Sequence, residues 1–426
     1  MGLAPPATPP QKISKITRNE VIPRNIELSA IEQAAERLKP ILHHTELDLS
    51  STFSAMTGGR VYLKCENRQK TGSFKIRGAS NKIAAMIERG EKCSVVASSA
   101  GNHAQGVAYA ASRFGIPATI VMPKAAPIAK VQATSGYGAK VVLDGDCYDD
   151  AYARALRICE EEGAAFLHPY NDPEVIAGQG TLGLEILADL PYVDMIVVPA
   201  GGGGLLAGVA CAVKQINPRV KVYGVQAEGA DAIARSFKEK KLVCTDSAAT
   251  IADGIAVKAP GDITVELINR YADGVVTVSD SEIANAILLL IERCKQVVEP
   301  AGATPLAAVL SGKLDVKGRR VVCVMSGGNI DVSFIQSIIE RGLVARHRRI
   351  KFIATLLDRP GSLVQLLNVL ADSGANILTV EHDKLNAGLN PNETNVHIAC
   401  EVGGEEHGRA VIDALRARGF RIELEQ

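Results

Sequence analysis

Length, composition and charge place this chain among globular proteins of more than one domain. Its 426 residues exceed what one compact core usually holds, and 47% of them are hydrophobic, which predicts two or three domains. Lys and Arg together number 47, as do Asp and Glu, so the chain lacks the basic footprint of a nucleic-acid-binding protein. Its longest apolar stretches have the length of a strand, which excludes a membrane-spanning helix.

The nine cysteines indicate a reducing compartment. They are scattered without any Cys-x-x-Cys pair, so we expect free thiols, no metal site and a cytoplasmic location. Residues 1–24 are rich in proline and lack the apolar stretch of a secretory signal. We expect a disordered tail there, with import into an organelle as the open alternative.

Short apolar strands alternate with helical stretches along most of the chain. Strands are predicted at 60–64, 95–97, 118–122, 140–143, 195–198, 220–226, 274–278 and 320–325, and helices at 76–89, 102–113, 148–162 and 205–212. Buried strands that alternate with helices form parallel sheets, which bind ligands at the carboxyl ends of their strands. We therefore predict an α/β body over residues 25–342, with a small subdomain at about 66–163 inserted in a larger one.

The pattern changes after the body. Residues 343–348 are predicted to form a basic linker, and residues 349–426 to form a separate small α+β domain of βαββαβ order. Its strands are expected at 352–357, 377–380, 396–402 and 420–424, and its helices at 363–370 and 410–418. The first of these helices carries leucines at 363, 366, 367 and 370, which is the spacing of one buried face.

Lys75 lies in a polar, glycine-containing stretch between apolar segments. A lysine before a helix is usually a solvated charge. Here Ser73 is of a helix-capping type and would place Lys75 in a first helical turn. The backbone dipoles of that turn and the charge of Arg77 would disfavour an ammonium ion and keep the amine nucleophilic. Lys75 is therefore the candidate catalytic residue.

Four consecutive glycines, Gly201, Gly202, Gly203 and Gly204, follow a predicted strand and precede a predicted helix. Without Cβ atoms, their N–H groups can approach an anion closely, and the helix start adds its dipole. A dinucleotide site is the competing interpretation, because Gly202, Gly204 and Ala207 form a loose fingerprint with Glu228 after the next strand. A purely structural turn is equally plausible for the glycines alone. Lys75 distinguishes the phosphate-site interpretation from the dinucleotide interpretation, because an enzyme that transfers hydride does not need this lysine.

Five segments taken together resemble the serine/threonine dehydratases of the fold-type-II pyridoxal-phosphate family. They are the lysine segment 64–78, the substrate loop 98–106, the glycine loop 201–204, the segment 299–303 and the turn 326–329, in family order. The resemblance implies a tryptophan synthase β-like body of two parallel-sheet domains, with pyridoxal 5'-phosphate as cofactor.

The resemblance also implies a role for each matching residue. Lys75 would carry the cofactor and then remove the Cα proton of the substrate. The cofactor ring would lie against Phe74, with Asn102 on its hydroxyl and Ser326 on its nitrogen, and the phosphate would lie against Gly201–Gly204 and Leu205. The substrate carboxylate would be bound by the backbone of Ser99, Ala100, Gly101, Asn102 and His103. Glu299 and Gly302 would support the site.

Three positions refine the chemistry that the resemblance implies. Ser326 offers the ring nitrogen a hydroxyl and no carboxylate, which leaves a weaker electron sink and favours β-elimination over transamination. Relatives that racemise serine carry a serine where Ala100 stands, so racemisation is not expected. Those relatives also bind a cation through a Glu and an Asp six residues later; here Glu228 is followed by Ala234, so no metal is expected.

The C-terminal segment resembles an ACT domain through the turn 358–361. Such modules bind amino acids between copies, and the resemblance implies an effector site at Arg359, Pro360, Gly361, Leu363, Asn376 and Ile377. A packing module without ligand is the alternative. Isoleucine or valine is the expected effector, and a homodimer or homotetramer the expected assembly.

The resemblance implies dehydration of L-threonine to 2-oxobutanoate and ammonia, with some activity on L-serine. A serine or 3-hydroxyaspartate dehydratase with the same cofactor is the alternative. A catalytically inactive amino-acid sensor is the alternative from another class.

Overall fold

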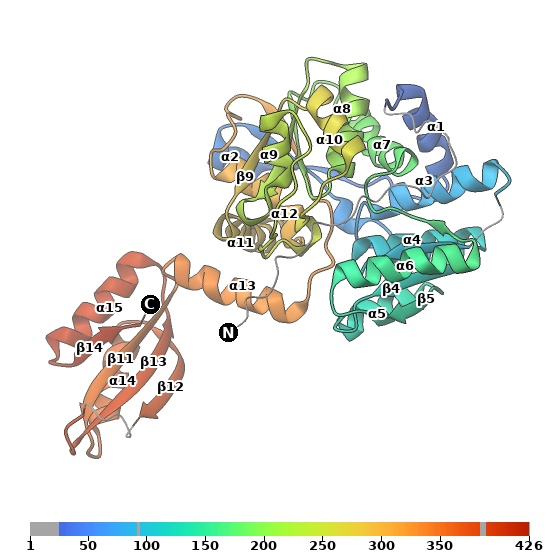
Figure 1. Cartoon of the computed structure of the whole chain (residues 1–426). Helices are drawn as coiled ribbons and strands as arrows, with labels where there is room; N and C mark the ends of the chain where they lie inside the picture. The colour runs from blue at the N-terminus through green and yellow to red at the C-terminus, as the bar shows by residue number, and fades with distance from the viewer. Residues whose placement is uncertain (1–24, 92–93, 384–388, 426) are drawn as a thin grey trace, which may run out of the picture.

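The computed structural model describes residues 25–91, 94–383 and 389–425 (Figure 1). The expected N-terminal tail, residues 1–24, lies outside them. The described chain forms an α/β body of two subdomains and a smaller C-terminal unit. Its strands make three sheets, of six, four and four strands, and the predicted fold class is confirmed.

The large subdomain is built on the six-stranded sheet, in the order β1-β2-β10-β7-β8-β9. Its strands are β1 (Leu47–Ser50), β2 (Arg60–Lys64), β7 (Met195–Pro199), β8 (Lys221–Ala227), β9 (Gly274–Val278) and β10 (Arg320–Val324). β1 is antiparallel to β2, and the other neighbours are parallel. Apolar side chains cover both faces of the sheet in two separate clusters, which explains why the predicted strands are continuously apolar.

Helices cover both faces of this sheet. They are α1 (Leu28–Leu38), α2 (Ser51–Thr57), α7 (Pro173–Asp189), α8 (Gly204–Ile216), α9 (Ala232–Glu239), α10 (Asp262–Tyr271), α11 (Asp280–Leu289), α12 (Pro300–Leu310) and α13 (Val332–Ala345). Short helical turns accompany them: η1 (Glu66–Arg68), η2 (Glu228–Ala230), η3 (Asp253–Ile255) and the π-helix η4 (Leu290–Cys294). Side chains of α1, α7, α8 and α10 join one cluster, and side chains of α11 and α12 join the other.

The small subdomain contains a four-stranded parallel sheet in the order β5-β4-β3-β6. Its strands are β3 (Val95–Ser98), β4 (Ala118–Met122), β5 (Lys140–Leu143) and β6 (Ala165–Phe166), and its helices are α3 (Lys75–Glu88), α4 (Asn102–Phe114), α5 (Ile128–Gly136) and α6 (Tyr148–Glu162). Apolar side chains of α3 and α4 form one cluster with one face of this sheet. Apolar side chains of α6 form a second cluster with its other face. β6 extends the predicted subdomain slightly, to residue 166.

Helix α7 fixes the distance between the lysine segment and the glycine loop. It packs against α3, which begins at Lys75, and against α8, which begins at the glycine loop. A Cβ on Gly178 of α7 would lie 2.7 Å from the Arg77 carbonyl oxygen, and one on Gly208 of α8 would lie 2.4 Å from the Ile176 carbonyl oxygen. Glycine at both contacts therefore lets the three helix backbones approach closely.

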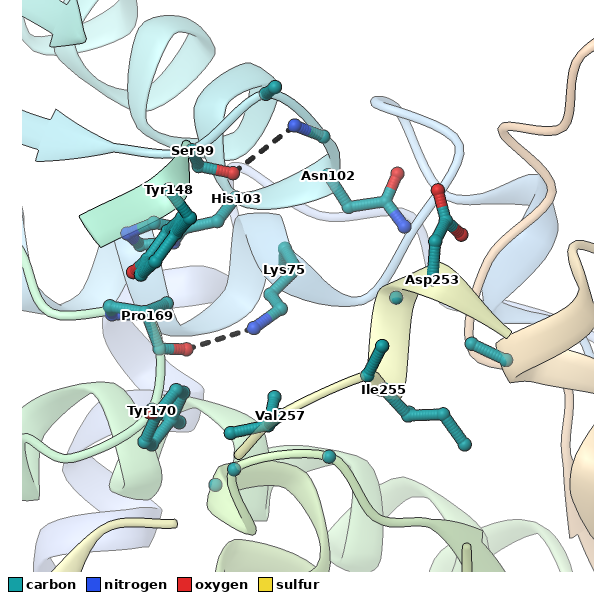
Figure 2. Close-up of a pocket in the computed structure, with 18 of the residues that line it drawn as sticks. Lys75, Ser99, Asn102, His103, Tyr148, Pro169, Tyr170, Asp253, Ile255 and Val257 are labelled. Atoms are coloured by element: carbon teal, nitrogen blue, oxygen red, sulfur yellow. Dashed lines mark hydrogen bonds between the residues drawn. The ribbon is translucent and has the colours of Figure 1, made fainter. Parts of the chain in front are cut away.

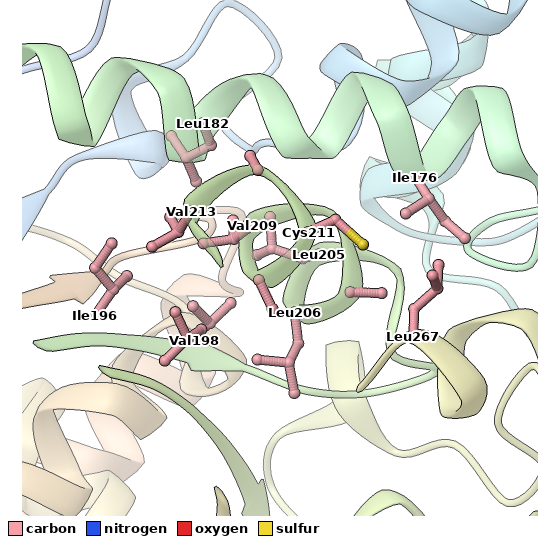
Figure 3. Packing of buried hydrophobic residues seen from close by; sticks show 14 of the residues in the cluster. Ile176, Leu182, Ile196, Val198, Leu205, Leu206, Val209, Cys211, Val213 and Leu267 are labelled. Atoms are coloured by element: carbon pink, nitrogen blue, oxygen red, sulfur yellow. The ribbon is translucent and has the colours of Figure 1, made fainter. Parts of the chain in front are cut away.

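The first turns of α8 are anchored by apolar packing. Figure 3 shows Leu205, Leu206, Val209 and Val213 among buried side chains of α7, α10 and β7. Burying a leucine or valine side chain stabilises the fold by about 1.5–3 kcal/mol. The glycine loop at the start of this helix is consequently attached to one of the most buried elements of the body.

The C-terminal unit has the predicted βαββαβ order. It consists of β11 (Arg349–Leu357), α14 (Ser362–Asp372), β12 (Asn376–Asp383), β13 (Glu393–Glu401), α15 (Glu405–Ala417) and β14 (Arg421–Leu424). The sheet is antiparallel, in the order β12-β13-β11-β14, and it has its own hydrophobic core. Of the four predicted leucines, Leu366 and Leu370 are fully buried, and Leu363 and Leu367 pack against the same core from its edge.

The predicted linker at 343–348 is wrong in its extent. Helix α13 continues through Ala345, and only three residues separate it from β11 (Figure 1). Within this short connection Arg346 and Arg348 both form ion pairs with Glu292 of η4. The connection is therefore held to the body by charge.

Among the described residues, no helix is both long enough and apolar enough to cross a membrane.

Candidate active site

One cavity of about 640 Å³ brings most of the predicted site residues together (Figure 2). The small subdomain and the large subdomain both line it. Of the predicted residues, its lining includes Phe74, Lys75, Ser99, Ala100, Gly101, Asn102, His103, Gly201, Gly202, Gly203, Gly204, Leu205, Glu299 and Ser326. The volume is that of a site for a small molecule or cofactor.

Gly302 lies outside this lining. A Cβ at that position would come within 3.0 Å of the Gly327 carbonyl oxygen and 2.9 Å of the Val298 side chain. Gly302 therefore lets α12 pack closely behind the turn that contains Ser326. Its position supports the site through packing and gives it no direct contact with the cavity.

Lys75 is the first residue of α3, and its Nζ donates a hydrogen bond of 2.9 Å to the carbonyl oxygen of Pro169 (Figure 2). Burial by the surrounding protein lowers the pKa of Lys75 to about 8, while the nearby Glu299 acts in the opposite direction. A substantial fraction of neutral amine is therefore present near physiological pH, as a nucleophile or proton acceptor requires.

Lys75 lies in the first turn of a helix as predicted, but the predicted cap and the predicted effect of Arg77 on its pKa were wrong. Ser73 does not cap α3, because Phe74 occupies the N-cap position and the buried Ser73 hydroxyl has no hydrogen-bond partner among the described residues. The charge of Arg77 is compensated by Glu66 and Glu185, to which it donates at 2.7 Å each. Burial is the main cause of the shift in the pKa of Lys75, and no neighbouring cation contributes to it.

Backbone hydrogen bonds join the lysine segment to the turn that contains Ser326. The N–H of Phe74 donates to the Ser326 carbonyl at 3.0 Å, and the N–H of Gly328 donates to the Gly72 carbonyl at 2.9 Å. Ser73 and Gly327 form an isolated antiparallel bridge between them. Two segments from opposite ends of the body are thus fixed side by side at the cavity.

The glycine loop forms a cradle that side chains would fill. A Cβ on Gly202 would lie 2.4 Å from the Tyr170 ring, and one on Gly204 would lie 2.9 Å from the Tyr170 Cβ. Gly203, at the N-cap of α8, has a φ of 96° that disfavours any other residue. The loop therefore presents only backbone to the cavity, at a helix start that favours a phosphate.

These residues fit pyridoxal phosphate. Lys75 offers a partly neutral amine, the glycine loop offers a phosphate cradle, and the buried Ser326 and the amide of Asn102 offer polar groups for the ring. The same arrangement does not favour the dinucleotide interpretation, because Glu228 is exposed at the end of β8 and does not line the cavity.

Two buried histidines near Lys75 are neutral. His103 donates from Nε2 to the Leu167 carbonyl at 2.9 Å, and burial, followed by the charge of Lys75, lowers its pKa to about 3. Nδ1 of His168 accepts from the N–H groups of Tyr170 and Asn171, and burial lowers its pKa to about 4. Neither histidine adds a positive charge to the cavity near neutral pH.

Several lining residues were not predicted. The Pro169 carbonyl, the ring of Tyr170, Tyr148 at the start of α6 and the segment 253–259 all face the cavity, some of them in Figure 2. The segment 253–259 begins with Asp253, which forms an ion pair of 3.4 Å with Lys130 of the small subdomain. The segment 253–259 follows no predicted strand directly, so no local pattern marked it. A backbone carbonyl such as that of Pro169 leaves no signal in a sequence.

The residues predicted for the effector site do not come together within one copy. Arg359, Pro360 and Gly361 follow the end of β11, where Leu357 faces Glu393 of β13. Asn376 faces Glu401 at the other end of β13. Within one chain the residues predicted for the effector site therefore form two groups at opposite ends of the C-terminal sheet.

Comparison with known proteins agrees with this geometry. The family model for pyridoxal-phosphate dependent enzymes matches residues 38–327. The L-threonine ammonia-lyase of Thermotoga maritima is 51% identical over 399 residues, which make up 94% of this chain and 99% of that protein. The catabolic L-threonine dehydratase of Escherichia coli K12 is 47% identical over 315 residues, 74% of this chain and 96% of that protein. The structure of maize serine racemase has a TM-score of 0.70 and 38% identity, and the match covers 75% of this chain and 99% of that one.

Proposed function

This chain belongs to the family of pyridoxal-phosphate dependent enzymes, and we propose that it deaminates L-threonine to 2-oxobutanoate and ammonia. The observation that carries this proposal is a buried lysine of lowered pKa that shares one cavity with a phosphate cradle. The chain is also 51% identical to an L-threonine ammonia-lyase over nearly its full length. Threonine loses one water molecule across Cα and Cβ, and hydrolysis of the resulting enamine consumes one water molecule. The overall reaction therefore yields the oxo acid and ammonia without net consumption of water.

Bound pyridoxal phosphate supplies an electron sink that stabilises negative charge at the substrate Cα. The residues of this chain do the rest. Backbone N–H groups at the start of α4 bind the substrate carboxylate, and those of the glycine loop at the start of α8 bind the phosphate. Lys75 takes the Cα proton on Nζ, and the Pro169 carbonyl, 2.9 Å away, orients this amine. Ile255, Val257 and Tyr170 add apolar surface that excludes water around it.

Substrate assays test this proposal directly. Purified protein loaded with cofactor should release 2-oxobutanoate and ammonia from L-threonine in equal amounts, and pyruvate more slowly from L-serine. Lys75→Ala should lose this turnover together with the visible absorption of lysine-bound cofactor. Turnover by Lys75→Ala would refute the assignment of Lys75, and a preference for serine or 3-hydroxyaspartate would favour the alternative dehydratases.

Racemisation is the second activity to measure, because a serine racemase has the same fold. Ala100 lines the cavity, and its methyl group cannot donate a proton to the opposite face of the substrate. D-serine should therefore not accumulate from L-serine. Its formation would require another proton donor in the cavity.

We propose further that the C-terminal unit binds an amino acid such as isoleucine or valine between two copies of the chain. The separation of Arg359 from Asn376 within one copy supports this, because a site that contains both groups of residues then needs one group from each of two copies. Titration of isoleucine should shift the threonine saturation curve, and Gly361→Ala, at a φ of 89°, should weaken that response. Sedimentation of the full chain should show a dimer or tetramer. A monomer that still responds to isoleucine would contradict the shared site.

A further inference from the structure

A chain of amide hydrogen bonds fixes the side chain of Asn102 at the cavity. Nδ2 of Asn329 donates to the Thr71 carbonyl at 2.9 Å and to Oδ1 of Asn102 at 2.8 Å. A carbonyl oxygen only accepts, so the atom of Asn329 that faces Thr71 must be its nitrogen. The same nitrogen must then meet an acceptor on Asn102, which assigns Oδ1 to that side.

The carboxylate of Glu299 fixes the same amide from its other end. Nδ2 of Asn102 donates to the two carboxylate oxygens at 2.9 and 2.8 Å. If the amide were turned over, an oxygen would face the carboxylate and a nitrogen would face the donor on Asn329. Both neighbours therefore require one orientation.

Glu299 has no structural task that explains this contact. It is the N-cap residue of α12, but its side chain accepts no capping hydrogen bond. It is 5% exposed, and in the described part of the chain no cationic side chain forms an ion pair with it. Burial raises its pKa to about 7, against the hydrogen bond from Asn102. A buried carboxylate held mainly by one amide is costly, which indicates a function at the site.

We infer that Glu299 and Asn329 are positioning residues that hold the Asn102 amide so that its remaining N–H meets the ring hydroxyl of bound pyridoxal phosphate. An amide nitrogen carries two hydrogens, and a carboxylate that receives one of them leaves the second for another acceptor. Asn102 belongs to α4 of the small subdomain, whereas Glu299 and Asn329 belong to the large one. The inference rests on the proposed function, because it concerns the same cofactor.

The test measures cofactor affinity with and without the ring hydroxyl. Apoprotein is titrated with pyridoxal phosphate and with 3-deoxypyridoxal phosphate, and binding is followed by absorbance. Glu299→Ala and Asn329→Ala should each weaken binding of pyridoxal phosphate about 3- to 10-fold, the effect of one lost hydrogen bond. Both should bind the deoxy analogue as the wild type does, because the analogue has no oxygen for Asn102 to meet.

Two further variants keep the test decisive. Asn329→Asp replaces the donor by an acceptor of the same size, so the Asn102 amide can satisfy only one of its two neighbours. The variant should lose the same discrimination between the two cofactors. Glu228→Gln, at an exposed carboxylate, is the matched control and should change neither affinity.

Equal losses for both cofactors would overturn the inference and assign Glu299 and Asn329 to subdomain closure. No loss for either cofactor would also overturn it. The proposed substrate is tested separately, because these titrations contain no amino acid. A wild type that binds neither cofactor would refute the proposed function itself.

Discussion

Lys75 combines burial with a hydrogen bond to an uncharged acceptor, the Pro169 carbonyl. A carboxylate at that place would have stabilised the ammonium form. A carbonyl orients the amine with less electrostatic stabilisation of its charge. The lysine therefore remains available as a nucleophile near neutral pH. A solvated lysine, with a pKa of about 10.4, is almost fully protonated there.

The lowered pKa of Lys75 predicts a pH dependence. Capture of pyridoxal phosphate by the apoprotein, trapped by borohydride reduction, should speed up as pH rises through about 8 and then level off. The folded state binds fewer protons at Lys75 than the unfolded state between that pH and 10.5, so its contribution to the free energy of unfolding rises with pH across this window. A rate that keeps rising towards pH 10 would place the reaction on exposed lysines. Lys75→Ala is the control.

At the scale of residues, the sequence predicted the site residues whose side chain has a recognisable function, and the glycines whose lack of a side chain is itself the signal. Lys75, Asn102, Ser326 and the glycine loop all line the cavity. The Pro169 carbonyl and the Asn329 contact depend on how distant segments meet, so no local pattern reveals them. The cause of the Lys75 pKa was wrong for the same reason: the partners of Arg77 come from other elements.

At the scale of elements, a buried ion cluster joins β2, α3 and α7. Arg77 is bound by Glu66 and Glu185, and the fully buried Lys64 pairs with Glu185 and Asp189. Arg77 belongs to the same helix turn as Lys75. The cluster therefore fixes the start of α3 relative to the large subdomain.

Arg77→Ala should lower the free energy of unfolding by about 3–5 kcal/mol, because it leaves Glu66 buried without its cation. Chemical denaturation measures this loss. Arg409→Ala, which breaks an exposed pair with Glu405, should cost less than about 1 kcal/mol. Similar losses in the two variants would mean that Glu66 finds another partner.

The close contact between α7 and α8 predicts a second effect. Gly208→Ala places a Cβ 2.4 Å from a backbone oxygen, so α8 must shift, at a cost of about 1–3 kcal/mol. Cofactor affinity should fall as well, because the glycine loop moves with the helix. Gly136→Ala has open space around its Cβ and should change neither quantity. An unaltered cofactor affinity in Gly208→Ala would show that the loop is held independently of α8.

Several predicted strands and one predicted helix agree with the structure in their bounds. β2, β4, β5, β9 and α6 have the predicted bounds. α13 was missed although Ser333, Gln336 and Glu340 lie on one exposed polar face. Its last turn was taken for a linker because basic residues follow it at 346–349. Helix boundaries there depend on contacts with η4, which the local sequence does not encode.

At the scale of the whole molecule, the connection to the C-terminal unit is bound to the body by Glu292 and, through Arg346, by Asn285. Glu292 lies in the π-helix η4 and binds Arg346 at 3.1 Å as well as Arg348. Single-turn π-helices are frequent at functional sites, and Glu299 follows η4 by only a few residues. The connection and the cavity thus meet in one short stretch of chain.

Glu292→Gln should free Arg348 and leave Arg346 with Asn285 alone. Trypsin cleavage after Arg346 or Arg348 should then speed up about five- to tenfold, the effect of losing about 1 kcal/mol of local stability. Gel electrophoresis of timed digests measures the rate. Glu340→Gln, on exposed α13, is the control. Cleavage at the wild-type rate would show that the connection is held by packing alone.

The hydrogen bond between Asn329 and Thr71 spans 258 positions of the chain. At about 5–20 residues per second, a ribosome needs roughly 13–50 s to supply the second partner after the first. During that interval the nascent lysine segment has emerged without the turn that completes its surroundings. The site can therefore be completed only after residue 329 has been added, and a chain that terminates before it carries Lys75 without the completed site.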